Sequence, residues 1–192
     1  MSYRALVVAG PNGAGKTTFV HEYLATHSWR YISADVIAEG MESDSIDKVR
    51  LAAGKKFFRQ IGAQIEGGGD FVVESTLSGV TFKEVMAQLR RAGYCISIVF
   101  IFLGSADLCV GRIRERVRKG GHDVPETDIC RRFSRSIRNF WEEYRHLADS
   151  WHLFYNGGAQ FHEVALGEGD SLEVRDEGLL DLFLGAAEGE TR

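Results

Sequence analysis

The sequence lacks an apolar run that approaches the ~20 residues needed to span a membrane, so we expect no membrane partner. Cysteine is scarce: Cys95, Cys109 and Cys130 are widely spaced and form no CxxC or Cys/His ligand pattern, which favours reduced thiols in a cytoplasmic protein and gives thiol catalysis no support. Because Met1 to Arg4 lead directly into an apolar segment, we expect no signal peptide. The formal charge of −4 argues against a nucleic-acid partner held by overall attraction.

What the chain does contain is typical of an ordinary globular protein. Of its 192 residues, 44% are hydrophobic and 26% are charged, and we find no internal repeat and no long linker. A chain of this length can bury a sizeable core. We therefore expect one domain over residues 1–192.

The most informative stretch reads GPNGAGKTT and matches the phosphate-binding loop pattern G-x-x-x-x-G-K-[ST]. An apolar strand precedes it at Ala5–Ala9 and a helical pattern follows at Thr17–Ala25, which is the context that the motif requires. The alternative is a glycine-rich turn that binds nothing. The expected nucleotide contacts are Gly10, Pro11, Asn12, Gly13, Ala14, Gly15, Lys16, Thr17 and Thr18.

Each residue type in this loop has a physical reason. Glycine tolerates backbone angles that turn successive N–H groups inward, where they cradle phosphate oxygens at the positive end of the following helix. Lys16 is expected to bring its charge to the β and γ phosphates. The hydroxyl of Thr17 is expected to ligate Mg²⁺.

Apolar segments of strand length alternate with helical patterns along the chain, which predicts a three-layer α/β sandwich of the P-loop NTPase type around a mainly parallel central sheet. The predicted strands lie in Ala5–Ala9, Trp29–Ser33, Asp70–Gly79, Tyr94–Leu103 (the central strand), Trp151–Tyr155 and Gln160–Leu166 (an edge strand). The predicted helices are Thr17–Ala25, Ile46–Glu66, Phe82–Arg91, Ala106–Lys119, Pro125–Ala148 and Leu179–Leu184, followed by a frayed tail over residues 185–192.

Two carboxylates stand at the ends of predicted strands. Asp35 follows the second strand, where ligands of open parallel sheets bind, and it is a candidate general base for an acceptor hydroxyl. The alternative is a helix N-cap for a helix that begins at Val36. Glu74 ends a strand and is expected to act on Mg²⁺ through water or to hold the substrate; the alternative is a solvated acid at the strand end.

Cations are concentrated in one region. Residues 112–138 contain nine Lys or Arg and four acids, a net charge of +5 in a chain of negative total charge. Arg112 and Arg116 share a helix face, and the glycine-hinged connection after them suits a lid over residues 106–138 that brings arginines to the phosphates. The alternative is a pair of solvated helix faces, which we favour for Arg114, Arg118 and Lys119. His122 has no ligand partners at metal spacing and is expected to contact the lid or the substrate.

The ordered set of motifs resembles the zeta-toxin family of P-loop kinases over roughly residues 3–156. The motifs that carry the resemblance are GPNGAGKTT at 10–18, SAD at 33–35, ESTLSG at 74–79, Arg112 and Arg116, GGHDVP at 120–125, Arg131-Arg132 and Tyr155-Asn156. The resemblance implies ATP- and Mg²⁺-dependent phosphorylation of a small-molecule hydroxyl, which in the toxins is the sugar 3′-hydroxyl of UDP-N-acetylglucosamine. It also implies a possible antitoxin partner.

By position, the resemblance implies catalytic roles for Lys16, Asp35, Arg112 and Arg116. It implies substrate contacts at Asp35, Glu74, Thr76, His122 and Arg132. The chain departs from the family where a second lid arginine is expected, because His122 stands there and Arg131 or Arg132 would have to supply the charge. It is also shorter after Asn156, which puts the nucleotide-sugar acceptor in doubt.

Other functions remain open at this point. A different small P-loop kinase, of the gluconate, shikimate or antibiotic phosphotransferase type, would use the same roles with another acceptor. A nucleotide-dependent switch or ATPase would act on a protein partner. A nucleic-acid end kinase draws on the +5 segment but lacks an identifiable aromatic stacking platform.

Overall fold

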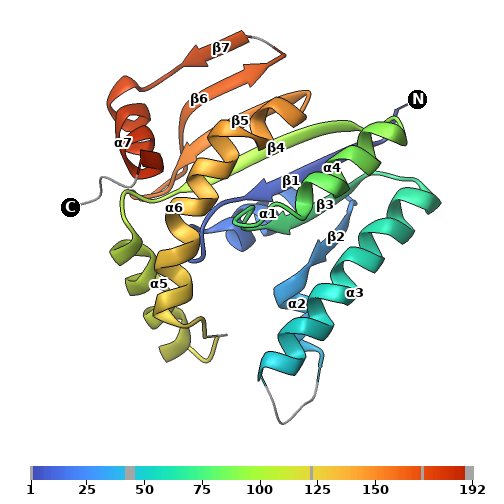
Figure 1. Cartoon of the computed structure of the whole chain (residues 1–192). Helices are drawn as coiled ribbons and strands as arrows, with labels where there is room; N and C mark the ends of the chain where they lie inside the picture. The colour runs from blue at the N-terminus through green and yellow to red at the C-terminus, as the bar shows by residue number, and fades with distance from the viewer. Residues whose placement is uncertain (1, 42–45, 122, 170, 189–192) are drawn as a thin grey trace.

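The protein is built on a seven-stranded sheet with the order β2-β3-β1-β4-β5-β6-β7 (Figure 1). The computed structural model describes residues 2–41, 46–121, 123–169 and 171–188. The first five strands pair in parallel and the last two are antiparallel, so the expected mainly parallel sheet is confirmed. The strands are β1 (Arg4–Ala9), β2 (Arg30–Ser33), β3 (Phe71–Ser75), β4 (Cys95–Phe102), β5 (Ser150–Tyr155), β6 (His162–Glu168) and β7 (Ser171–Val174).

Helices connect the parallel strands, and the predicted helices are present. They are α1 (Lys16–Leu24), α2 (Ala34–Glu39), α3 (Ile46–Gly67), α4 (Phe82–Arg91), α5 (Ala106–Arg118), α6 (Glu126–Glu142) and α7 (Glu177–Glu188). The predicted single helix Pro125–Ala148 is wrong in its second part: α6 ends at Glu142, and a 3₁₀ helix, η1 (Tyr144–Leu147), follows. The backbone turns there because Tyr144 is fully buried and donates its hydroxyl to the carbonyl of Gly79.

Strand β4 lies in the middle of the sheet, which explains the long apolar run in its sequence. Strand β4 is the fourth of seven, and five consecutive residues from its middle to its end are buried. Strands covered on both faces read as continuous apolar runs rather than as alternating ones. The expectation that Tyr94–Leu103 contains the central strand is confirmed.

Two hydrophobic clusters lie on opposite faces of the sheet and form the three layers. The larger one packs α3, α4, α6 and α7 against one face and contains aromatic contacts such as the Phe100–Phe140 stack, with ring centroids 4.3 Å apart. The smaller one packs α1 against the other face through Val20 and Phe19. Within the described part of the chain, no helix is long and apolar enough to cross a membrane.

The C-terminal part differs from prediction in two ways. β6 is not an edge strand, because β7 pairs with it on the outside. The polar–apolar alternation of β7 is only four residues long, and all four residues are exposed. Helix α7 continues to Glu188, so the tail predicted to fray from Gly185 is wrong for residues 185–188. Ala186 and Ala187 are buried against the core there.

Strand register brings distant residues to one edge of the sheet. Glu74 pairs with Ser33 on one side and with Val8 on the other. The phosphate-binding loop leaves β1 just beyond Val8, and α2 begins just beyond Ser33. The loop, Asp35 and Glu74 therefore meet at the carboxyl end of three adjacent parallel strands.

Candidate active site

The loop between β1 and α1 has backbone angles that require glycine. Gly10 has φ 137° and Gly13 has φ 79°. A Cβ at Gly10 would lie 2.0 Å from the carbonyl oxygen of Ile101, and one at Gly13 would lie 2.8 Å from that of Cys109. Neither position can therefore carry a side chain without moving the neighbouring backbone.

Lys16 is held inside this loop. Its side chain is 7% exposed, and its Nζ donates to the carbonyl of Pro11 at 3.0 Å and lies 3.9 Å from Oε1 of Glu74. A buried ammonium group is costly unless it is paired and hydrogen-bonded, and these two oxygens meet that need. The positive charge is thus fixed at the N-terminus of α1, where phosphate would bind.

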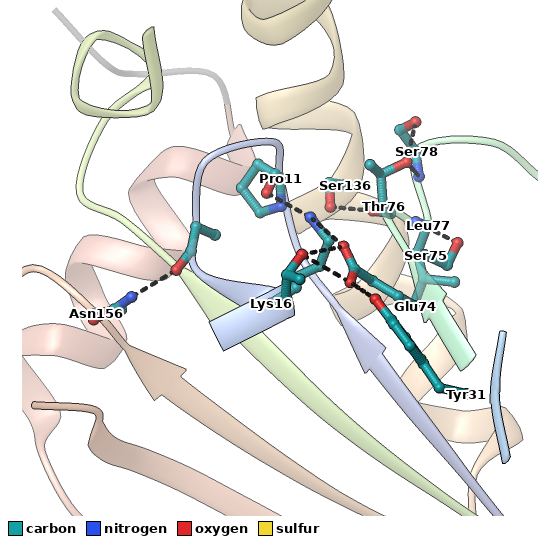
Figure 2. Close-up of polar contacts among 12 residues, drawn as sticks. Pro11, Lys16, Tyr31, Glu74, Ser75, Thr76, Leu77, Ser78, Ser136 and Asn156 are labelled. Atoms are coloured by element: carbon teal, nitrogen blue, oxygen red, sulfur yellow. Dashed lines mark hydrogen bonds and ion pairs between the residues drawn. The ribbon is translucent and has the colours of Figure 1, made fainter. Parts of the chain in front are cut away.

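Glu74 is the centre of a buried hydrogen-bond cluster shown in Figure 2. Its carboxylate accepts from Thr17 Oγ1 at 3.0 and 3.3 Å and from the Tyr31 hydroxyl at 2.5 Å. Burial, followed by the neighbouring Glu74 charge, raises the pKa of Tyr31 well above its usual value, so the phenol stays a donor. The alternative of a solvated acid at the strand end is wrong, because Glu74 is 7% exposed.

The oxygen atoms around Thr17 fit Mg²⁺. A hydroxyl and a carboxylate are hard ligands, and this ion is usually held by one or two such groups together with substrate phosphates rather than by a complete protein cage. In keeping with that, the described residues form no group of three or more His, Cys, Asp or Glu that would hold a metal alone. Thr17 and Glu74 are the residues that would hold the ion.

Two cavities open on either side of Lys16. The first, of 720 Å³, lies over the loop between α1 and α5, and we call it the loop cavity. The second, of 480 Å³, lies between α3, α6 and the segment after β3, and we call it the α3–α6 cavity. Both are lined by Asn12, Lys16, Ser33, Asp35 and Glu74.

The residues shared by the two cavities include a polar group without a partner. Asn12 is 6% exposed, and its Oδ1 receives no hydrogen bond from any residue that the structure describes. Buried amide groups are rarely left unpaired. This one lies where a nucleotide in one cavity and a second molecule in the other would meet.

Asp35 lies at the same junction. It is exposed and belongs to the first turn of α2, but the N-cap of that helix is Ser33. The alternative interpretation of Asp35 as the N-cap is therefore wrong. Asp35 lines both cavities.

Most of the other predicted site residues line one cavity each. Gly13, Gly15, Thr17, Thr18, Arg112 and Arg116 line the loop cavity, whereas Thr76 and Arg132 line the α3–α6 cavity. Gly10, Pro11 and Ala14 line neither cavity and shape the loop from behind; the Pro11 and Ala14 carbonyls accept from Lys16 and Asn156. His122 lies outside the described residues. Arg131 and Arg132 line the α3–α6 cavity and not the loop cavity, so here they do not replace a second lid arginine.

Asn156, at the end of β5, ties the loop to helix α5. Its Nδ2 donates to the carbonyl of Ala14 at 2.8 Å, and its own carbonyl accepts from Arg112 Nη2 at 2.5 Å. In the sequence, Asn156 belongs only to the Tyr155-Asn156 motif of the family resemblance, and no role is predicted for it. It lines the loop cavity, and it fixes both the loop and an arginine.

The segment after β3 is held from the other side by α6 and η1. Ser136 donates to the carbonyl of Thr76, Asn139 donates to that of Leu77 at 2.9 Å, and Tyr144 donates to that of Gly79. Leu77 has φ 51°, an unusual angle for a bulky residue, and is buried. The wall of the α3–α6 cavity is therefore rigidly built, and α6 carries both its arginines and its supports.

The fold and the loop define a P-loop kinase-like protein. Residues 6–135 match the AAA domain family AAA_33, and the chain belongs to that family. An uncharacterized protein of Haemophilus influenzae is 26% identical over 133 residues, which are 69% of this chain and 94% of that protein.

Solved structures share the fold at low identity. A chain of the AvrRxo1-ORF1:AvrRxo1-ORF2 complex has a TM-score of 0.73 and 15% identity over 94% of this chain, which spans 63% of that chain. The same complex is known with ATP, with a TM-score of 0.72. The PezAT chromosomal toxin–antitoxin system of Streptococcus pneumoniae has a TM-score of 0.67 and 18% identity over 96% of this chain and 79% of that chain. These likenesses show a shared fold and are not specific to the zeta toxins.

Proposed function

We propose that the protein transfers the γ-phosphoryl group of MgATP to a hydroxyl of a small molecule. The observation that carries the proposal is the position of Asp35, which lines both the loop cavity and the α3–α6 cavity beside the same lysine, Lys16. A phosphotransferase needs this arrangement, because the donor and the acceptor must meet in line at one carboxylate.

The chemistry follows from the residues at the junction. The loop amides and Lys16 bind and orient the β and γ phosphates, and Arg112 with Arg116 offset the negative charge of the transferring group. Asp35 accepts the proton of the acceptor hydroxyl while the oxygen of that hydroxyl forms a bond to the γ-phosphorus. At the same time the bond between the γ-phosphorus and the β–γ bridging oxygen breaks, and ADP leaves. Mg²⁺ held by Thr17 and the nucleotide would neutralise charge on the phosphate oxygens.

For the acceptor, the first candidate is a nucleotide sugar such as UDP-N-acetylglucosamine. It rests on the zeta-toxin resemblance and on the likeness to a chain of a toxin–antitoxin system. That likeness also makes an antitoxin protein a partner to be looked for. The PezAT and AvrRxo1 structures support the ATP proposal only as relatives in fold, one of them crystallised with ATP.

The test is phosphoryl transfer from γ-³²P-labelled ATP in the presence of Mg²⁺. Wild type and Lys16→Ala are incubated with a metabolite set that includes UDP-N-acetylglucosamine, gluconate and shikimate. We expect one acceptor to become labelled by wild type and not by Lys16→Ala. ATP binding with slow hydrolysis and no labelled acceptor would instead identify a nucleotide-dependent switch or ATPase.

A further inference from the structure

The outer wall of the α3–α6 cavity is made of arginines. Arg131, Arg132 and Arg135 from consecutive turns of α6 all line it. The side formed by the strand ends, which we call the inner end, carries the carboxylates of Asp35 and Glu74 beside Lys16. The lining is therefore positive on the α6 side, which we call the outer end, and carries two carboxylates at the inner end.

These arginines are only partly neutralised. Asp128 pairs with Arg131 at 2.8 Å, with Arg132 at 3.5 Å and, across the cavity, with Arg50 of α3 at 3.9 Å. Arg135 is exposed and makes no hydrogen bond or ion pair with any residue that the structure describes. Among the described residues, one carboxylate, that of Asp128, therefore pairs with three guanidinium groups, and Arg135 has no acidic partner.

Such a cluster is unfavourable without an anion. Arg131 and Arg135 are four residues apart on one helix, where like charges repel. The chain as a whole has a formal charge of −4, so the cluster does not reflect a general excess of cations. Arginine forks match the oxygens of phosphate and carboxylate groups, which makes these anions the natural occupants.

The α3 side of the cavity carries two aromatic side chains and an unfilled space beside a glycine. Phe57 and Phe58 of α3 line the cavity in an edge-to-face pair with ring centroids 5.3 Å apart, and Phe58 is 38% exposed. Gly54 lies one turn earlier, and a Cβ there would meet no atom within 4 Å. Glycine inside a helix is unfavourable relative to alanine, and no close packing requires it here, so its effect is to leave room in the cavity.

We propose that the acceptor carries an anionic group, a phosphate ester or a carboxylate, in addition to the hydroxyl that is phosphorylated. Arg131, Arg132 and Arg135 bind that anion at the outer end, and a ring of the acceptor lies against Phe58. The carboxylates at the inner end repel the anion, which orients the molecule with its hydroxyl toward Asp35. This inference rests on the proposed function and narrows its substrate class.

Binding is tested first, without turnover. The loop cavity is saturated with Mg²⁺ and the non-hydrolysable analogue AMP-PNP, and inorganic pyrophosphate is then titrated calorimetrically into wild type, Arg132→Gln and Arg135→Gln. We expect one further site that each substitution weakens about tenfold, because each removes a charged hydrogen bond. Arg138→Gln is the matched control on α6: its Nε donates to the carbonyl of Ala187, away from the cavity, and its affinity should equal that of wild type.

Turnover is tested with acceptors that differ only in the anion. N-acetylglucosamine is compared with its 1-phosphate, and glucose with glucuronate, which keeps the sugar ring, so that phosphate and carboxylate are distinguished. We expect the anionic member of one pair to be phosphorylated at least tenfold more efficiently, with Arg135→Gln raising its KM and leaving kcat nearly unchanged. A 5′-hydroxyl oligonucleotide is included as a further acceptor.

The outcomes separate this inference from the proposed function. Pyrophosphate binding that depends on Arg132 and Arg135, with no acceptor labelled, would sustain the anion site and contradict the kinase. Phosphorylation of a neutral acceptor as efficiently as its anionic partner, or insensitivity of pyrophosphate binding to both arginine variants, would overturn the anion site and leave the kinase. Preference for the oligonucleotide over every small acceptor would overturn the small-molecule acceptor in favour of a nucleic-acid substrate.

Discussion

The hydroxyl of Tyr31 donates a 2.5 Å hydrogen bond to Glu74, the carboxylate that also accepts from Thr17. Tyr31 belongs to the edge strand β2 and Glu74 to β3, so one phenol links two strands to the phosphate-binding loop. Thr17 is the expected Mg²⁺ ligand. Tyr31 would therefore position the carboxylate that, together with Thr17, would hold Mg²⁺.

Replacing Tyr31 with Phe removes only this hydroxyl. Hydrogen-bond partners of groups around a metal typically change its affinity about 10- to 100-fold, and we expect the lower end here, because Thr17 still donates to Glu74. The measurement is Mn²⁺ binding in the presence of nucleotide, followed by electron paramagnetic resonance. Tyr23→Phe is the control, because the Tyr23 hydroxyl makes no hydrogen bond with a described residue. Equal Mn²⁺ affinity in wild type and Tyr31→Phe would show that Tyr31 does not position Glu74.

Two asparagines make the same kind of hydrogen bond to different loops. Asn156 donates to Ala14 in the phosphate-binding loop at 2.8 Å, and Asn139 donates to Leu77 in the segment after β3 at 2.9 Å. Each alanine substitution removes one hydrogen bond that holds a loop, which should cost about 1 kcal/mol and so raise the KM of the ligand bound by that loop roughly fivefold. We expect Asn156→Ala to raise the KM for ATP and Asn139→Ala to raise the KM for the acceptor. The two variants are each other's control, and a shift of both constants in both variants would argue against separate donor and acceptor cavities.

Glycines 54 and 62 of α3 provide a test by steric block. Neither is required by packing, since a Cβ at either would meet no atom within 4 Å, but only Gly54 lines the α3–α6 cavity. Gly54→Leu should stabilise the helix, because glycine costs up to about 1 kcal/mol in a helix interior, and yet raise the KM for the acceptor at least tenfold. Gly62→Leu should stabilise it similarly and leave the KM unchanged. Thermal unfolding measures the stability of each variant, and steady-state kinetics measure its KM for the acceptor. A wild-type acceptor KM in Gly54→Leu would place the acceptor outside the α3–α6 cavity.

The cysteines should differ in reactivity. Burial raises the pKa of Cys109 to about 12, so at pH 8 only about one molecule in ten thousand holds it as the thiolate that alkylating reagents attack. Cys95 and Cys130 are exposed. Iodoacetamide at pH 8 followed by mass spectrometry should modify those two and leave Cys109 intact. Rapid modification of Cys109 in the folded protein would mean that α5 opens readily.

Local patterns in the sequence were sufficient for much of the fold. The strand–loop–helix around Gly10 to Thr18 is contiguous, and strand β4 is covered on both faces, so both could be read without knowing their neighbours. Strand β7 was missed because its alternation of polar and apolar residues is only four residues long and none of the four is buried. The end of α6 was missed because Tyr144 turns toward Gly79, 65 residues away.

The site was predictable only where it is local in sequence. Asp35 and Glu74 stand at strand ends and could be placed at one edge of the sheet from that alone. Tyr31 gave no signal, because its contact with Glu74 depends on β2 pairing with β3 rather than with another strand. The cations of residues 112–138 could be recognised as a cluster, but which of them line the loop cavity and which line the α3–α6 cavity depends on how α5 and α6 pack.

The most direct test of the account is the rate of phosphoryl transfer by Asp35→Asn in single-turnover experiments with saturating MgATP and acceptor. Base catalysis contributes typically ~10²- to 10⁴-fold, so the account predicts a loss of at least about 100-fold with ATP affinity unchanged. Glu22→Gln removes the same charge from α1, at a residue that lines neither cavity, and should keep the wild-type rate. Transfer by Asp35→Asn at the wild-type rate would contradict the central claim that this carboxylate accepts the proton of the acceptor hydroxyl during transfer.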